Sequence, residues 1–133
     1  MKKVFNMAKY VIPEDIENDA AEYMEDVLSE LENRGILEEV DSAALTMLAR
    51  NYSMFIKASK QLEIDGLTVL SDRGNIAPHP LIKIAKDAQT QAMKVMLEFG
   101  LTAKSRTKLP KKDSEDAEPS PFEQFVKEGK EVR

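Results

Sequence analysis

The sequence of 133 residues contains no cysteine and no long apolar run. Without cysteine the chain has no disulfide scaffold, no thiolate zinc ligand and no cysteine nucleophile, which suits a reducing compartment. No stretch approaches the 18 consecutive apolar residues that indicate a membrane-spanning helix, so we expect no membrane partner. The lysines at the start are soon followed by Lys9 and Pro13, which leaves no apolar core for a signal peptide. These absences predict a cytoplasmic protein.

Residues that could form a catalytic or metal centre are also scarce. His79 is the only histidine, and one histidine without thiolates does not complete a zinc site. Its place before Pro80 favours a helix-capping role instead. The five glycines are scattered and form neither a GxxxxGK[ST] phosphate loop nor a Gly-x-Ser-x-Gly nucleophile elbow. We therefore predict no catalytic residue, no metal and no cofactor.

Charge is unevenly distributed along the chain, although the net value is only −5. Residues 1–12 carry three lysines and no acid, whereas residues 13–41 carry twelve acids and one base. Bases outnumber acids again over residues 42–106, residues 107–112 add three lysines, and residues 113–133 return to acid. Phosphate binding depends on where bases cluster, so the acidic total does not exclude a nucleic-acid partner. Ordinary fluctuation along a globular chain explains the same pattern equally well.

Apolar spacing predicts a mainly α fold that begins with an antiparallel helical hairpin. The first helix is expected over residues 14–34, with Glu14, Asp15 and Glu17 in its first turn and Gly35 at its end. The second is expected from the N-cap Asp41 to about residue 65. The short linker between them makes the two helices antiparallel neighbours. The two apolar stripes are Ile16, Ala20, Tyr23, Met24, Val27, Leu28 and Leu31, then Leu45, Leu48, Tyr52, Phe55, Ile56 and Leu62.

After Gly66 the pattern changes. Residues 67–78 predict a small two-stranded β-hairpin or an extended loop, which must lean on the helices or on another subunit because a lone hairpin is marginal in water. A third long helix is predicted from the N-cap His79 to Gly100, and Thr102 can cap a short fourth helix through Lys108. The expected core stripe of the third helix is Leu81, Ile84, Ala85, Ala88, Ala92, Val95 and Phe99.

The third helix carries a second apolar set on another face. This set consists of Ile82, Met93, Met96 and Leu97. Such a face either widens the core of the domain or contacts another subunit, because large apolar patches are unusual on a small isolated domain. It is our candidate contact for a homo-oligomer.

Composition divides the chain into three parts. Residues 1–12 are expected to form a flexible basic N-terminus, residues 13–109 a helical domain, and residues 110–133 a mobile acidic tail rich in proline and charge. Within the tail, a possible partner-binding peptide lies at residues 121–126. Its apolar residues fall on one face of a helical turn, at Phe122, Phe125 and Val126. The peptide either binds a partner's groove, packs on its own domain or frays.

The order of these signals resembles the phage terminase small subunit. The similarity covers roughly residues 13–109, and its most specific part is Gly100-Leu-Thr-Ala-Lys-Ser-Arg106, close to the LGLTPxSR signature that ends the family's domain. The chain departs from the family where His79 replaces a usual Asn and Ala103 a usual Pro. Met24 and Phe55 likewise stand where tryptophans are frequent. These departures affect capping and packing.

The resemblance implies a non-catalytic subunit that binds double-stranded phage DNA at packaging initiation. It also implies assembly into a homo-oligomeric ring that delivers DNA to the large terminase subunit and modulates that subunit's ATPase and nuclease in the host cytoplasm. Arg106 belongs to the signature, and it either contacts DNA or braces the domain through an acidic partner. The candidate DNA contacts are Lys104, Arg106, Lys108, Lys111 and Lys112, with Lys2, Lys3 and Lys9 as a second group. The alternatives are a helical interaction scaffold without DNA binding and a small DNA-binding regulator.

Overall fold

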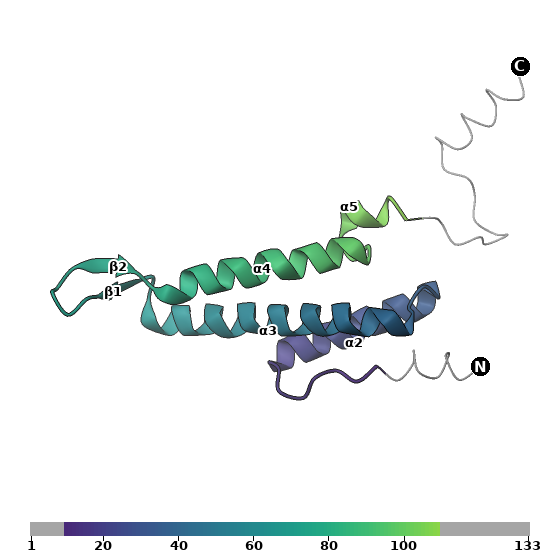
Figure 1. Cartoon of the computed structure of the whole chain (residues 1–133), viewed down its shortest axis with the longest axis horizontal. Coiled ribbons are helices and arrows are strands. Elements are labelled where there is room, and N and C mark those ends of the chain that lie inside the picture. The colour runs from purple at the N-terminus through teal and green to yellow at the C-terminus, as the bar shows by residue number, and fades with distance from the viewer. Residues whose placement is uncertain (1–9, 110–133) are drawn as a thin grey trace, which may run out of the picture.

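The computed structural model describes residues 10–109, which form a mainly helical fold with one small antiparallel sheet (Figure 1). Its elements are α2 (Asn18–Arg34), the 3₁₀ turn η1 (Glu39–Asp41), α3 (Ser42–Asp65), β1 (Thr68–Leu70), β2 (Ile76–Pro78), α4 (Pro80–Glu98) and α5 (Ala103–Arg106). Helices α3 and α4 lie side by side along the length of the molecule, with the hairpin at one end and α5 near the other (Figure 1). The predicted fold class is confirmed.

Helix α2 begins at Asn18, so the predicted start at residue 14 is wrong by about one turn. Glu17 has an extended backbone (φ −61°, ψ 145°), and its amide donates a 2.8 Å hydrogen bond to the hydroxyl of Ser53 on α3. This tertiary bond outweighs the attraction of the acidic residues to the helix dipole. Two ion pairs of 3.1 Å also hold the preceding segment on α3: Asp15–Arg50 and Glu17–Lys60.

The connection from α2 to α3 follows the prediction at its boundaries. Gly35 ends α2 with φ +67° and donates to the carbonyls of Leu31 and Glu32. Asp41 directly precedes α3, yet its carboxylate does not cap that helix. It accepts a 2.9 Å bond from the amide of Glu38 and closes the η1 turn, which runs directly into α3. The predicted boundary at Asp41 is therefore confirmed, but the predicted capping of the second helix by its side chain is wrong.

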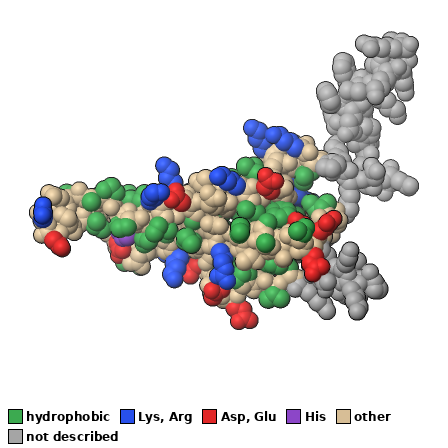
Figure 2. All heavy atoms as spheres, viewed as in Figure 1, with side chains coloured by type: hydrophobic (Ala, Val, Ile, Leu, Met, Phe, Trp, Pro, Cys, Tyr) green, Lys and Arg blue, Asp and Glu red, His purple; other side chains and the backbone are tan. Residues whose placement is uncertain are grey.

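Residues 67–78 form the hairpin rather than an extended loop, with Val69 opposite Ala77 in an antiparallel register. Gly74 in the turn has φ +83°, which glycine adopts without strain. The strand residues with half-buried side chains are Val69 and Ala77, whereas Leu70 and Ile76 are exposed. Figure 2 shows hydrophobic side chains on the surface of this end of the molecule.

Helix α4 starts where the sequence predicted. The Nδ1 atom of His79 accepts a 3.0 Å bond from the amide of Leu81, and Pro80 occupies the first helical position. The Nε2 atom of the same ring lies 2.9 Å from Asp65, the last residue of α3. The imidazole therefore caps α4 and joins it to α3 across the base of the hairpin.

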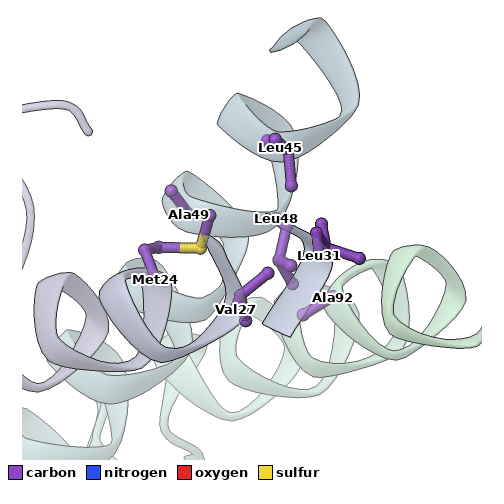
Figure 3. Packing of buried hydrophobic residues seen from close by; sticks show 7 residues of the cluster. All are labelled: Met24, Val27, Leu31, Leu45, Leu48, Ala49 and Ala92. Atoms are coloured by element: carbon purple, nitrogen blue, oxygen red, sulfur yellow. The ribbon is translucent and has the colours of Figure 1, made fainter. Parts of the chain in front are cut away.

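The core lies where α2 packs on the first half of α3 and the second half of α4. The largest buried side chains are Met24, Leu31, Leu45 and Leu48 (Figure 3). Small residues, Ala58, Ala85, Ala88 and Ala92, are buried along α3 and α4 and let the two helices approach closely. Ile84, expected in this stripe, is 41% exposed. Alanines thus form the line of contact on α4, and Ile84 lies at its margin.

Candidate nucleic-acid interface

The segment Gly100–Arg106 fixes the short helix α5 at the end of α4. The hydroxyls of Thr102 and Ser105 lie 2.6 Å apart, and each also accepts a 3.1 Å bond from the other residue's amide. This is a reciprocal capping box, and it buries Ser105. Gly100 turns the chain with φ +65° beneath the side chain of Leu109. The signature residues therefore hold α5 in one orientation.

Arg34 joins the acidic helix α2 to this turn. Its guanidinium donates a 2.9 Å bond to the carbonyl of Phe99 and a 3.1 Å bond to that of Gly100, while Nε pairs with Glu30 at 2.8 Å. A helix C-terminus carries unpaired carbonyls and partial negative charge, which a cation neutralises. The one base among twelve acids in residues 13–41 thus anchors α4 and α5 to α2.

Three of the predicted DNA contacts lie together at this end of the molecule. Lys104, Arg106 and Lys108 are all exposed. Arg106 donates a 3.2 Å bond to the carbonyl of Leu101 and forms no ion pair with another described residue. The acidic partner considered for Arg106 is therefore absent from residues 10–109, while its bond to Leu101 helps to orient the guanidinium on α5.

Helix α4 extends the positive surface. Lys83, Lys86 and Lys94 are exposed and fall on one face of the helix, over about 16 Å of its axis. The carboxylate of Asp87 pairs with Lys83 at 2.8 Å and raises the pKa of that lysine. Lys86 and Lys94 form no ion pair within the described part of the chain. Figure 2 shows lysine and arginine side chains along α4 and near α5. We define the basic edge as the exposed bases from α4 to Lys108 that form no ion pair within the described residues: Lys86, Lys94, Lys104, Arg106 and Lys108.

Acidic side chains gather on the other side of the molecule, over α2 (Figure 2). They include Asp19, Glu22, Glu25, Asp26, Glu30 and Glu32. An open cleft of about 310 Å³ lies between α2 and α5, and Asp26 and Glu30 line it together with Arg34 and Arg106. Mixed charges in this cleft do not favour phosphate, because the carboxylates repel it. The surface suited to a polyanion is therefore the basic edge.

The remaining predicted site residues divide between the described and undescribed parts of the chain. Met93 and Leu97 are exposed by 41% and 51%, whereas Ile82 and Met96 are half-buried and Met96 packs against the core. The other candidates lie outside the described residues: Lys2, Lys3, Lys9, Lys111, Lys112, Phe122, Phe125 and Val126.

Two features of this surface were missed by sequence reasoning. Arg34 was read only as part of the charge pattern, although its isolation among acids was a signal that it has a specific partner. Lys86 and Lys94 were not singled out, because their spacing is that of any solvated helix face. The chain path through Gly100 brings α5 to the end of the helix that carries these lysines.

Among residues 10–109, no group of three or more histidine, aspartate or glutamate side chains could hold a metal ion. None of the helices over the same range is long and apolar enough to cross a membrane. The fold and surface thus define a small helical protein in which a long antiparallel helix pair, crossed by an acidic helix, presents a basic edge.

The chain belongs to the family described as phage terminase, small subunit, whose sequence model matches residues 20–116. It therefore has a role in phage DNA packaging, in a family that is generally regulatory rather than catalytic. The family also implies interaction with phage DNA and with the large terminase. Neither the curated proteins nor the solved structures contain a match to this chain.

Proposed function

We propose that this chain is a non-catalytic packaging subunit that assembles into a homo-oligomeric ring, binds double-stranded phage DNA and delivers it to the large terminase subunit. It modulates the ATPase and nuclease of that subunit in the cytoplasm of the host cell and needs no cofactor of its own. The observation that carries this proposal is the outward display of Lys104 and Arg106 on a helix fixed by its own capping box.

The basic edge supports DNA binding by its geometry. Side chains on α4 and α5 project from rigid elements, so little conformational entropy of the backbone is lost when they meet phosphates. The edge is modest for one subunit, since acidic α2 lies on the same molecule. In a ring each copy repeats the edge, and many weak phosphate contacts act together. The basic residues outside the described range, Lys111 and Lys112, continue the same sequence and belong to the proposal.

A fluorescence anisotropy titration with duplex DNA over a range of salt concentrations tests DNA binding. The logarithm of the association constant should fall linearly with the logarithm of the salt concentration, because each phosphate contact releases counterions. Lys104→Glu with Lys108→Glu should weaken binding at low salt by at least about tenfold and make the salt slope shallower.

Lys57→Glu is the matched control, since Lys57 is exposed on α3, outside the basic edge. Lys57→Glu changes the net charge by the same amount as Lys104→Glu alone, yet it should weaken DNA binding far less than that single variant. If Lys57→Glu and Lys104→Glu lowered the affinity for DNA equally, only the net charge would matter, and this result would contradict a defined basic edge. A chain that stays a monomer and binds no duplex at low salt would contradict the proposal as a whole.

A helical interaction scaffold without DNA binding is the second candidate. The exposed side chains of Met93 and Leu97 favour it, because they offer a protein partner an apolar surface. Charge reversal of the lysines in the basic edge separates the two functions. If the chain is a DNA-binding packaging subunit, the variant should lose DNA retention. If the chain is only an interaction scaffold, the variant should bind the large subunit as the unchanged chain does. A small DNA-binding regulator would instead protect a promoter in a footprinting experiment rather than a packaging site.

A further inference from the structure

Large hydrophobic side chains are exposed at the hairpin end of the molecule. Four of them lie within thirteen consecutive residues: Ile64 is 77% exposed, Leu67 65%, Leu70 72% and Ile76 73%. We call these four the hairpin patch: Leu70 and Ile76 share one face of the ribbon, Leu67 falls on the other by strand alternation, and Ile64 lies on the adjoining end of α3. Each of the four is more exposed than Met93 and Leu97 on α4, which are 41% and 51% exposed. Leaving four such side chains in water is unfavourable, because burial of apolar surface is the main favourable contribution to association.

The strand register brings two of these residues together. Leu70 lies directly opposite Ile76. The amide of Ser71 donates to the carbonyl of Asn75 in the next pair, and the amide of His79 donates to Leu67 three pairs away on the other side, so bonded and non-bonded pairs alternate between them. Leu70 and Ile76 are therefore a non-hydrogen-bonded pair, whose side chains lie closest on one face of the ribbon. Both are exposed, so this face of the sheet is apolar and uncovered within the described chain.

The sheet itself has only two strands, which is marginal for independent stability in water. The outer edge of β2 ends in Pro78, which has no amide hydrogen to offer an added strand. Extension of the sheet on that side is therefore hindered. Burial of the apolar face formed by Leu70 and Ile76 is a way for an added partner to stabilise the hairpin without extending the sheet.

Charge indicates what kind of partner fits. Between Gly66 and Pro78 the only charged residues are Asp72 and Arg73, adjacent at the turn and opposite in sign. A neutral apolar surface does not attract a polyanion, which argues against DNA. Two copies of it approach without repulsion, and the Asp72 of one copy can face the Arg73 of the next. The acidic face of α2, by contrast, would repel its own copy.

We propose that the hairpin patch is buried against the hairpin end of a neighbouring copy of this chain. This inference rests on the self-association in the proposed function and names one surface of it. Contact of a patch with its own copy joins subunits in pairs, so a ring needs a second surface, for which the apolar face of α4 with Met93 and Leu97 is the candidate. The hairpin lies at the opposite end of the long helix pair from α5 (Figure 1). Contact between hairpins therefore leaves Lys104 and Arg106 of every copy free to meet DNA. Self-association also explains how a two-stranded sheet with an uncovered face is stable.

Leu70→Ser with Ile76→Ser tests the contact, with light scattering of the full-length chain over a range of concentrations. The apparent association constant should fall at least about tenfold, because two buried side chains lose their apolar transfer energy. The matched control is Ile36→Ser with Val40→Ser, two residues that are 48% and 78% exposed outside the hairpin. The control should associate like the unchanged chain, and circular dichroism should show the same helix content in all three.

The absence of cysteine permits a second measurement that does not depend on a destabilising substitution. Ile76→Cys labelled with pyrene should show excimer fluorescence in the oligomer, since pyrene pairs emit in this way only when they are in contact. Val40→Cys labelled in the same way should not. Excimer emission that disappears on dilution to monomers supports contact between hairpins even if the double serine variant misfolds.

The outcomes separate this inference from the proposed function. If the unchanged chain is a monomer at all concentrations, self-association fails and the inference fails with it. If Leu70→Ser with Ile76→Ser associates normally and Ile76→Cys gives no excimer, the ring stands and the hairpin contact is overturned. If this variant associates normally but loses binding to the large subunit, the hairpin patch takes a different protein partner and the inference is also overturned.

Discussion

At the scale of single residues, Gly100 has a conformation and a space that other residues do not fit. Its φ of +65° lies in the left-handed region, and a Cβ atom there would lie 2.5 Å from Cδ1 of Leu109. Gly100→Ala should lower the free energy of unfolding by about 1–2 kcal/mol for the backbone conformation alone. Displacement of Leu109 should add about 1–3 kcal/mol. Thermal unfolding followed by circular dichroism measures the loss.

Gly35 provides the control for this prediction. Its φ of +67° is nearly the same, but a Cβ atom would have no neighbour within 4 Å. Gly35→Ala should therefore lower the free energy of unfolding only through the strained backbone conformation, without a steric clash. Equal destabilisation by the two substitutions would show that Leu109 moves away freely and does not cover the turn.

His79 combines two bonds that a single substitution removes. Its Nδ1 accepts from Leu81, so the proton of the neutral ring is on Nε2 and donates to Asp65. His79→Ala should lower the free energy of unfolding by about 1 kcal/mol through loss of the cap. His79→Asn should recover most of this, because asparagine is a good N-cap residue, and equal stability of the two variants would contradict the capping role.

The same contact gives a pH dependence. Hydrogen bonds from Gln61 and His79 lower the pKa of Asp65 below its ordinary value. Its ionised form therefore stabilises the fold above about pH 4, and this contribution is lost as the pH falls through the lowered pKa. Asp65→Asn should make the stability less dependent on pH in this acid range, as measured by melting temperature. A hydrogen bond from Arg50 also lowers the pKa of Asp15, and this residue is unchanged in the variant. The dependence of stability on pH that Asp15 contributes should therefore remain, so the variant should lose only the part that Asp65 contributes.

At the scale of elements, Arg34 determines how α2, α4 and α5 are joined. Arg34→Ala removes the charged donor from the carbonyls of Phe99 and Gly100 and should lower the free energy of unfolding by about 2–3 kcal/mol. It should also weaken DNA binding, because α5 loses its anchor. Arg34→Lys should restore only part of the stability, since an ammonium lacks the planar fork that reaches two carbonyls.

Glu30→Gln separates the two roles of Arg34. It removes only the exposed i,i+4 ion pair on α2, which is worth about 0.3–0.5 kcal/mol. If Glu30→Gln lowered the free energy of unfolding as much as Arg34→Ala, the ion pair with Glu30 rather than the hydrogen bonds to Phe99 and Gly100 would be the stabilising contact of Arg34. Chemical denaturation at neutral pH distinguishes the two cases.

At the scale of the whole molecule, apolar surface remains exposed on α4 as well as at the hairpin. Met93→Ser with Leu97→Ser should reduce self-association if the face formed by Ile82, Met93, Met96 and Leu97 contacts another subunit. The control is Met47→Ser with Met54→Ser on α3, whose side chains are 61% and 49% exposed. Light scattering of the oligomer measures both. Normal association of the α4 variant would assign this face to a different partner or to none.

Charge is also separated across the whole molecule. The sequence shows acids concentrated in residues 13–41 and bases elsewhere, but it does not show where the two lie relative to one another. The fold places the acids of α2 on one side and the bases of α4 and α5 along another edge (Figure 2). The fold therefore decides where the basic edge meets the acids of α2: only at its α5 end, where Arg106 lines a cleft together with Asp26 and Glu30.

Much of the architecture was predictable because it depends on local physics. Apolar spacing gave the three long helices, and Gly35, Gly66 and the His79-Pro80 pair marked their ends correctly. The start of α2 was not predictable, because a bond between Glu17 and Ser53, 36 positions apart, decides it. The exposure of Ile84 was also missed, since spacing alone does not show that alanines form the contact line of α4.

The sequence by itself determined the three long helices and the capping residues His79 and Thr102, because these depend on interactions between residues a few positions apart. It left residues 67–78 open between a hairpin and an extended loop. The tertiary structure decided which residues meet: Arg34 with the end of α4, Asp65 with His79, and the lysines of α4 with those of α5 along one edge. It also decided that the apolar residues of the hairpin stay uncovered. Contacts between distant segments depend on how side-chain volumes fill the space between helices, and a linear pattern does not contain that information.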